Sequence, residues 1–138
     1  MNTPYKKDKI FAVIVCYRFE INKFKVNISH HLKNFSTIIL VNNSPEISLQ
    51  SLKSSKVTLI NNNSNIGLAF ALNVGILEAK KQGATIVALF DQDTLLPYDF
   101  LQNMLRCIHA YEGNKPPAVF APIFYNEVTN NFGFIINF

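Results

Sequence analysis

Residues 63–94 read NSNIGLAFALNVGILEAKKQGATIVALFDQDT, and this stretch decides the fold class. Its first half carries apolar residues at helical spacing, namely Leu68, Leu72, Ile76 and Ala79. Asn65 is placed to cap this predicted helix, and Gly83 stands where a glycine commonly ends one. Residues 85–90 (TIVALF) are apolar and rich in β-branched side chains, which predicts a buried strand. A helix that leads into a buried strand indicates an α/β fold.

The alternation of strand and helix continues on both sides of this stretch. Further strands are predicted at residues 9–16, 37–41, 57–60, 118–124 and 133–138. Further helices are predicted at residues 21–35, 46–53 (a weaker pattern) and 98–111, the last followed by Gly113. This order implies right-handed crossovers and a mostly parallel, Rossmann-like sheet flanked by helices. We therefore expect one α/β domain over residues 1–138.

The composition is that of a globular chain. Hydrophobic residues make up 49% of the 138 residues and charged residues 16%, which excludes an intrinsically disordered protein. The formal net charge is +4, but the basic residues are scattered, with no arginine-rich stripe and no interleaved aromatic residues. We therefore expect no nucleic-acid partner. The positive charge suits a phosphate-bearing small ligand or an anionic membrane surface.

The N-terminus and the cysteines favour a cytoplasmic protein. Three lysines precede the apolar run 10–17, but Arg18 and Glu20 follow it where a signal peptide would have small residues. Eight apolar residues are also too few to span a bilayer. Cys16 and Cys107 have no metal-binding spacing, so we interpret both as reduced, packed thiols.

Polar residues follow each of the first four predicted strands. They are Tyr17 after the first, Asn42 and Asn43 after the second, residues 61–65 (NNNSN) after the third, and Asp91, Gln92 and Asp93 after the fourth. The carboxyl ends of parallel strands meet at one edge of the sheet, which is where α/β proteins bind ligands. For the asparagine runs alone, an ordinary polar loop explains the pattern equally well.

Asp91 and Asp93 are the strongest candidates for a metal site. Two carboxylates one residue apart repel each other unless a positive charge lies between them. A turn at the end of a strand lets both reach one hard divalent cation, to which a diphosphate could add further oxygens. The alternative is a solvated turn in which Asp93 or Thr94 caps the following helix.

Four blocks of sequence together resemble the family 2 inverting glycosyltransferases, and within them the rhamnosyltransferase-like branch. The blocks are AVIVCY at 12–17, IILVNNS at 38–44, NSNIGLAFALNVGI at 63–76 and ALFDQDT at 88–94. The third block followed by Asp-Gln-Asp is the specific part, since either motif alone is short. The resemblance implies the nucleotide-binding sheet called GT-A.

The resemblance also implies roles for several residues. Tyr17 would border the nucleotide base, and Asn42 stands where the family usually has an aspartate that hydrogen-bonds a pyrimidine. The other expected substrate-binding residues are Asn43, Asn65, Gly67, Asn73 and Asp91. Asp91 would face the ribose and metal-bound water, and Asp93 would ligate Mg²⁺ or Mn²⁺. Leu72 replaces an arginine of many relatives, which removes one possible phosphate contact.

The resemblance to this family suggests a donor, an acceptor and a further segment that carries the catalytic base. The donor would be a dTDP- or UDP-linked sugar, with rhamnose the first expectation, and the acceptor a cell-surface glycan or a lipid-linked saccharide at the cytoplasmic face of the membrane. None of Asp99, Glu112 and Glu127 falls in a motif of the catalytic base, so we expect the base beyond Phe138. The apolar ending GFIINF is expected to be a boundary within a longer protein. This piece should then bind nucleotide, transfer sugar poorly and self-associate through apolar edges.

Other interpretations have less support. A haloacid-dehalogenase-like phosphatase needs Asp-x-Asp after the first strand, and a dinucleotide oxidoreductase needs Gly-x-Gly-x-x-Gly there. A non-catalytic nucleotide-binding module is the stronger alternative, given Asn42 and Leu72. Close packing of the helix on the sheet would equally explain its small residues, Ala69, Ala71 and Gly75. His30, His31 and His109 are expected at the surface or its boundary, without a role.

Overall fold

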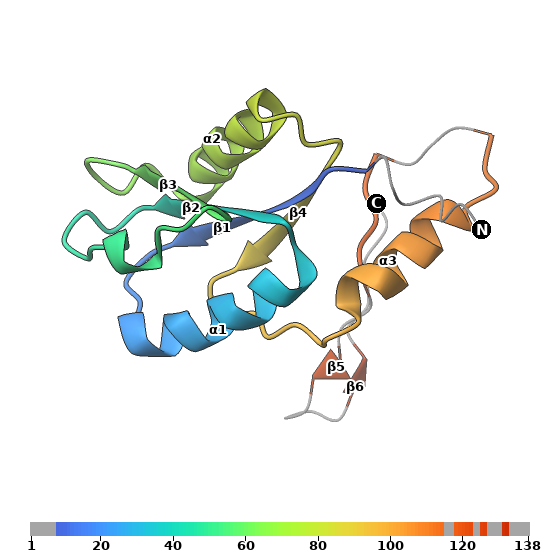
Figure 1. The fold of residues 1–138 in the computed structure, drawn as a ribbon, viewed down its shortest axis with the longest axis horizontal. Helices are drawn as coiled ribbons and strands as arrows, with labels where there is room; N and C mark the ends of the chain where they lie inside the picture. Colours follow the sequence, from blue (N-terminus) through green and yellow to red (C-terminus); the bar gives the residue numbers. More distant parts are fainter. Residues whose placement is uncertain (1–7, 115–117, 123–124, 127–130, 133–138) are drawn as a thin grey trace. The chain divides into compact units, whose positions relative to one another are not determined.

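The computed structural model of the chain describes residues 8–114, 118–122, 125–126 and 131–132, and it divides into two compact units, Met1–Leu101 and Gln102–Phe138. The first unit contains β1 (Ile10–Cys16), α1 (Ile21–Asn34), β2 (Thr37–Asn42), the 3-10 helix η2 (Gln50–Leu52), β3 (Val57–Asn61), α2 (Leu68–Lys81) and β4 (Ile86–Asp91) (Figure 1). Helix α3 (Phe100–His109) begins in the first unit, and the second contains the antiparallel pair β5 (Tyr125–Asn126) and β6 (Asn131–Phe132). The single domain over residues 1–138 stays a prediction.

Strands β1 to β4 form one parallel sheet in the order β3-β2-β1-β4. Val13 in β1 is in register with Ile39 in β2 and with Leu89 in β4, so β1 is paired along both edges. Helix α1 covers one face of the sheet and α2 covers the other (Figure 1). The prediction of a parallel α/β sheet flanked by helices is therefore confirmed.

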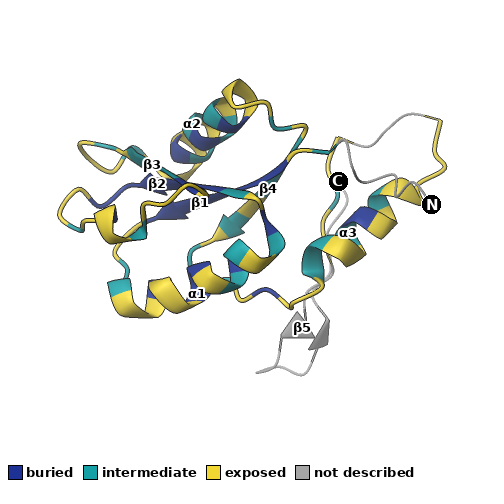
Figure 2. Cartoon of the chain, viewed as in Figure 1, coloured by how far each residue is buried: buried dark blue, intermediate teal, exposed yellow. Residues whose placement is uncertain are grey.

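The core lies around β1, which is buried at every position (Figure 2). On the face covered by α2, Phe11, Val13 and Val15 form one cluster with Ala71 and Ala79 of α2 and with alternate residues of β2. A strand with both faces covered needs apolar side chains on both, which is why residues 10–16 (IFAVIVC) are apolar throughout instead of alternating.

Helix α2 packs mainly through small residues, and of the predicted apolar stripe only Ala79 is fully buried, while Leu72 is partly buried against the core. Its buried residues are Ala71, Gly75 and Ala79, while 57% of Leu68 is exposed. A Cβ added at Gly75 would overlap Val13 Cγ1, so only glycine lets the helix approach this closely. Close packing thus explains Ala71 and Gly75, whereas Ala69 is exposed on the helix surface.

The start of α2 also differs from the prediction. Gly67 is the N-cap residue, and Asn65 lies outside the helix. The Oδ1 atom of Asn65 accepts the Gly67 N–H at 2.9 Å, which closes a turn before the helix begins. Gly67 has φ 82°, a left-handed conformation that favours glycine, although no described atom lies within 4 Å of a Cβ added there. Gly67 is thus required by the backbone conformation and not by crowding.

The remaining differences concern short or late elements. The weak helix predicted at residues 46–53 is only the 3-10 turn Gln50–Leu52. Residues 118–122 of the predicted strand 118–124 are not extended in a sheet, and the strand predicted at 133–138 lies outside the described residues. Helix α3 is shorter at both ends than the predicted 98–111. In the described part of the chain, no helix combines the length and apolar character needed to cross a bilayer.

Candidate functional site

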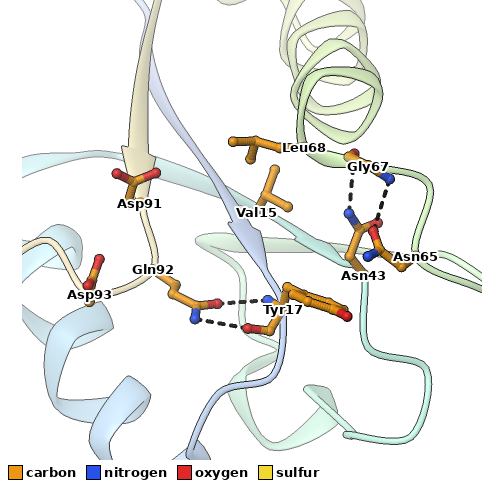
Figure 3. Close-up of a pocket in the computed structure, with 9 residues that line it drawn as sticks. All are labelled: Val15, Tyr17, Asn43, Asn65, Gly67, Leu68, Asp91, Gln92 and Asp93. Carbon is orange, nitrogen blue, oxygen red and sulfur yellow. Dashed lines mark hydrogen bonds between the residues drawn. The ribbon is translucent and has the colours of Figure 1, made fainter.

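A pocket of about 520 Å³ opens at the carboxyl ends of β1, β2 and β4. Six of the predicted site residues line it: Tyr17, Asn43, Asn65, Gly67, Asp91 and Asp93 (Figure 3). Val15, Leu68 and Gln92 complete the lining. The strand order explains the position, because the chain runs from β1 outward to β2 and β3 and then returns to the other side of β1 as β4. Crevices form where the strand order reverses in this way.

Asp91 and Asp93 stand together at the exit of β4. Asp91 is the last residue of the strand and is in register with Val15 of β1. The Thr94 N–H donates to the Asp91 carbonyl at 3.1 Å, which closes a turn directly after the strand. Both aspartates are exposed, and among the described residues neither joins a salt bridge. Two hydrated carboxylates thus lie at one edge of the pocket without a protein cation beside them.

The side chain of Gln92 joins the exits of β1 and β4. Its Oε1 atom accepts the Tyr17 N–H at 2.7 Å, and its Nε2 donates to the Tyr17 carbonyl at 3.0 Å (Figure 3). The amide therefore pairs with the Tyr17 backbone much as another strand residue would. Sequence reasoning assigned no role to Gln92, and its place between two aspartates was the only local signal.

Tyr17 lies where the chain turns away from β1. Arg18 after it has φ 45°, and its N–H donates to Ser44 Oγ at 2.8 Å. The Arg18 guanidinium stacks 5.1 Å from the centre of the Tyr17 ring, and 37% of Tyr17 is exposed. The ring thus has a fixed backbone and one supported face, which suits a flat ligand group at the pocket edge.

Asparagine amides hold the loop before α2. Asn43 Nδ2 donates to the Gly67 carbonyl at 3.3 Å, and Asn43 Oδ1 accepts from Asn62 Nδ2 at 2.7 Å. Since Asn65 accepts the Gly67 N–H, both polar groups of the Gly67 backbone are held by side chains. No side chain among the described residues caps the first turn of α2, so its N–H groups remain available beside the pocket.

Three positions that the sequence analysis singled out do not line the pocket. Asn42 is buried; its Nδ2 donates to the Ile47 carbonyl at 2.8 Å, and its Oδ1 accepts the Ser44 N–H at 2.9 Å. It does not line the pocket, so a contact with a base would require these hydrogen bonds to be exchanged. Asn73 is exposed on α2 and also lies outside the lining. Leu72 is partly buried against the core cluster.

The comparison with known proteins identifies the family. A family model described as Glycosyl transferase family 2 matches residues 13–132. The chain belongs to this family. It is also 28% identical over 130 residues to a dTDP-rhamnosyl transferase, RfbF, of Shigella flexneri. That match covers 93% of this chain and 43% of the relative, so the chain spans less than half of the relative's length. The match to the family includes every residue that lines the pocket.

In this family 2 chain, the side of α1 that faces the residues after β4 is polar. His31, which was expected at the surface, is 1% exposed, and its Nε2 lies 3.1 Å from the Thr94 carbonyl. Burial lowers the pKa of His31, with a smaller lowering from His30, while the hydrogen bond to Thr94 acts in the opposite direction. The surface prediction for His31 was wrong because helical periodicity alone does not reveal a polar neighbour from another element.

The described residues of this chain offer few side chains that could bind a metal ion. Within the described residues, no three of the His, Cys, Asp and Glu side chains come together. Asp91 and Asp93 would therefore be the protein's ligands, with the other oxygens coming from water and a bound diphosphate. Cys16, the buried thiol in β1, does not line the pocket. The donor set is hard oxygen, which fits Mg²⁺ or Mn²⁺.

Proposed function

We propose that this chain binds a nucleoside-diphosphate sugar for metal-dependent transfer to a glycan, with inversion at the anomeric carbon. The observation that carries the proposal is the pair Asp91 and Asp93 at the rim of a pocket whose other side holds Tyr17 and the start of α2. Membership of glycosyl transferase family 2 supports the reaction class. On this proposal, Tyr17, the start of α2 and the two aspartates would hold the base, the diphosphate and the ion, respectively.

The charges of a diphosphate suit the pocket. The uncapped N–H groups at the start of α2 and the positive end of its helix dipole favour an anion beside Gly67 and Leu68. Asp91 and Asp93 by themselves would repel that anion, so Mg²⁺ or Mn²⁺ between them would strengthen its binding. When bound, the ion would neutralise the diphosphate and stabilise the charge on the departing group.

The base and the sugar are proposed from the position of Tyr17 and from the relative. The exposed face of Tyr17 would stack on the nucleotide base. The name of the Shigella flexneri relative favours a dTDP-linked donor with rhamnose as the sugar, and a UDP-linked donor is the alternative that the experiment compares. Asp99 does not line the pocket, and neither Asp99 nor Glu112 falls in a motif of the catalytic base, so we assign neither as the base that activates the acceptor. The cytoplasmic location, peripheral membrane contact and self-association stay predictions.

Calorimetric titration with dTDP and UDP, with and without Mn²⁺, tests the proposal. We expect Asp91→Asn and Asp93→Asn each to weaken Mn²⁺-dependent binding by about tenfold or more, which corresponds to about 1.4 kcal/mol. Without Mn²⁺ the same variants should bind as well as the wild type or slightly better, because a repulsive charge is lost. Asp99→Asn, outside the pocket, is the matched control and should behave as wild type.

Two results would contradict the proposal. One is wild-type binding of dTDP and UDP that is insensitive to Mn²⁺. The other is equal Mn²⁺-dependent affinity in the wild type and both aspartate variants. Release of free dTDP from a dTDP-sugar in the presence of a saccharide acceptor would then separate transfer from binding alone.

A further inference from the structure

Helix α1 presents a row of polar side chains to the segment that follows β4. Asn27, His31 and Asn34 are spaced by four and three residues, which places them on one face of the helix. Asn27 and His31 are buried, with 7% and 1% of each exposed. Apolar side chains would normally occupy such inward positions of an amphipathic helix. The polar residues therefore need a specific partner.

That partner is the backbone of residues 92–97. Asn27 Nδ2 donates to the Gln92 carbonyl at 3.2 Å, and Asn34 Nδ2 donates to the Pro97 carbonyl at 3.2 Å. Between them, His31 Nε2 lies 3.1 Å from the Thr94 carbonyl. The row thus contacts three carbonyl groups along the segment that contains Asp93. These contacts join positions that are 63 to 65 residues apart in the chain.

The contact with Thr94 determines the state of the imidazole. A carbonyl oxygen can only accept, so Nε2 carries the hydrogen. Burial lowers the pKa of His31 and so favours the neutral ring, in which Nδ1 carries no hydrogen. Nδ1 is buried and has no hydrogen-bond partner among the described residues. Such an unsatisfied atom is unfavourable, and what the histidine provides that a phenylalanine could not is the bond from Nε2 to the Thr94 carbonyl.

The ring of His31 is also fixed by packing. It lies 4.9 Å from the ring of Phe90, the residue before Asp91, measured between ring centres. Phe90 in turn contacts Phe35 at 5.5 Å and Phe100 at 5.6 Å. His31 therefore holds the turn from the β4 side through Phe90 and from the far side through Thr94. The side chain of Gln92, which is paired with the Tyr17 backbone, also holds the turn.

We propose that His31, together with Asn27 and Asn34, is a positioning residue that fixes the backbone of residues 92–97 and so keeps Asp91 and Asp93 at the pocket before a ligand binds. The consequence for metal and diphosphate rests on the proposed function; the fixing of the backbone does not. Two like-charged carboxylates tend to move apart. A turn that is already ordered reduces the free energy that ligand binding must supply to bring them together. None of the three side chains lines the pocket, and each acts only through the backbone of the turn.

The experiment compares two variants of His31 with one of its neighbour. His31→Phe keeps an aromatic ring against Phe90 and removes the donor, whereas His31→Gln keeps an N–H near the Nε2 position. His30→Phe is the matched control, because His30 is adjacent and is only partly buried. Far-UV circular dichroism of each 138-residue variant establishes that the sheet has formed.

The first readout is hydrogen–deuterium exchange of the segment 91–97 in the protein without ligand. We expect about tenfold faster exchange of the Thr94 N–H in His31→Phe, since its bond to the Asp91 carbonyl opens more often. His31→Gln and His30→Phe should exchange as the wild type does. The second readout is the affinity for dTDP with Mn²⁺, expected to fall about tenfold in His31→Phe and to be restored in His31→Gln. The affinity without Mn²⁺ should not change.

The outcomes separate this inference from the proposed function. Unchanged exchange across 91–97 in a folded His31→Phe protein overturns the positioning role, whatever the binding data are. If the wild type lacks Mn²⁺-dependent binding while His31→Phe exchanges faster, the proposed function fails and the positioning role stands. Should His31→Phe not fold, Asn27→Leu removes the bond to the Gln92 carbonyl and is held to the same exchange criterion.

Discussion

The two thiols of this chain lie in opposite environments. Cys16 in β1 is 0% exposed, and burial raises its pKa to about 12. Cys107 in α3 is exposed. Because the thiolate is the reactive form, burial protects Cys16 twice: it blocks access and it keeps the proton on sulfur. The sequence predicted two packed thiols, and this is correct for Cys16 only.

We expect iodoacetamide to modify Cys107 alone in the native protein and both thiols after denaturation. Intact-mass measurement at pH 8 or so, where an ordinary thiol is partly ionised, provides the count. Cys107→Ser should remove the native reaction. Native modification of Cys16 in that variant would show that β1 is accessible, contrary to its burial.

The environment of His31, like that of Cys16, is set by the tertiary structure. Its ring packs against Phe90 of β4 and its Nε2 bonds to the Thr94 carbonyl, and both residues are far along the chain. Local sequence offered two adjacent histidines on a helix and no means of distinguishing them. The structure distinguishes them by the face of α1 on which each stands.

At the scale of the elements, the contact between α2 and the sheet depends on the absence of a side chain. Gly75 faces Val13 of β1 and Val41 of β2, and a Cβ there would overlap the first and lie 3.1 Å from the second. The helical spacing predicted a stripe of larger apolar residues that ends at Ala79, and of these only Ala79 is fully buried. Small residues instead occupy the buried ridge, since they allow α2 to lie close to two strands at once.

Gly75→Ala is therefore expected to destabilise the protein. Replacing a helical glycine by alanine favours the helix by roughly 1 kcal/mol, but overpacking a core costs about 1–3 kcal/mol. We expect a net loss of about 1 kcal/mol or more in the free energy of unfolding, measured by urea denaturation. Val13→Ala in the same chain should recover part of that loss by making room. A Gly75→Ala protein more stable than the wild type would refute the close approach.

At the scale of the whole molecule, the pocket belongs to the unit Met1–Leu101. Its lining runs in sequence from Val15 to Asp93, and the hydrogen bonds that shape it join residues within the same unit. All nine lining residues lie in the described part of this first unit. The proposed nucleotide binding can therefore be tested on this unit without most of the later chain.

We expect a chain of residues 1–113, which keeps α3, to retain Mn²⁺-dependent binding of dTDP within about threefold of the 138-residue chain. Calorimetry measures the affinity, and circular dichroism establishes that the shortened protein is folded. The same shortened chain with Asp93→Asn should lose the binding. A folded 1–113 protein that does not bind would mean that residues after 113 take part in the site.

Much of this organisation could be predicted from residues 63–94 and their neighbours. The parallel α/β sheet and the position of Asp91 and Asp93 at a strand exit follow from local periodicity, because apolar spacing and β-branched runs reflect burial directly. Of the eight predicted site residues, six line the pocket, and Asn73 is exposed on α2 outside it. Asn42 does not line it either, since its amide closes the turn after β2.

The tertiary structure alone decided what surrounds these residues. The order β3-β2-β1-β4 brings Gln92 to Tyr17, 75 positions earlier, and α1 to the turn after β4, 63 or more positions away. Hydrogen bonds between such distant residues leave no periodic pattern, because each side chain matches a backbone group and not a neighbour in sequence. Sequence determined that the two carboxylates stand at the end of a buried strand; the packing of β1 and α1 around β4 determined how they are held.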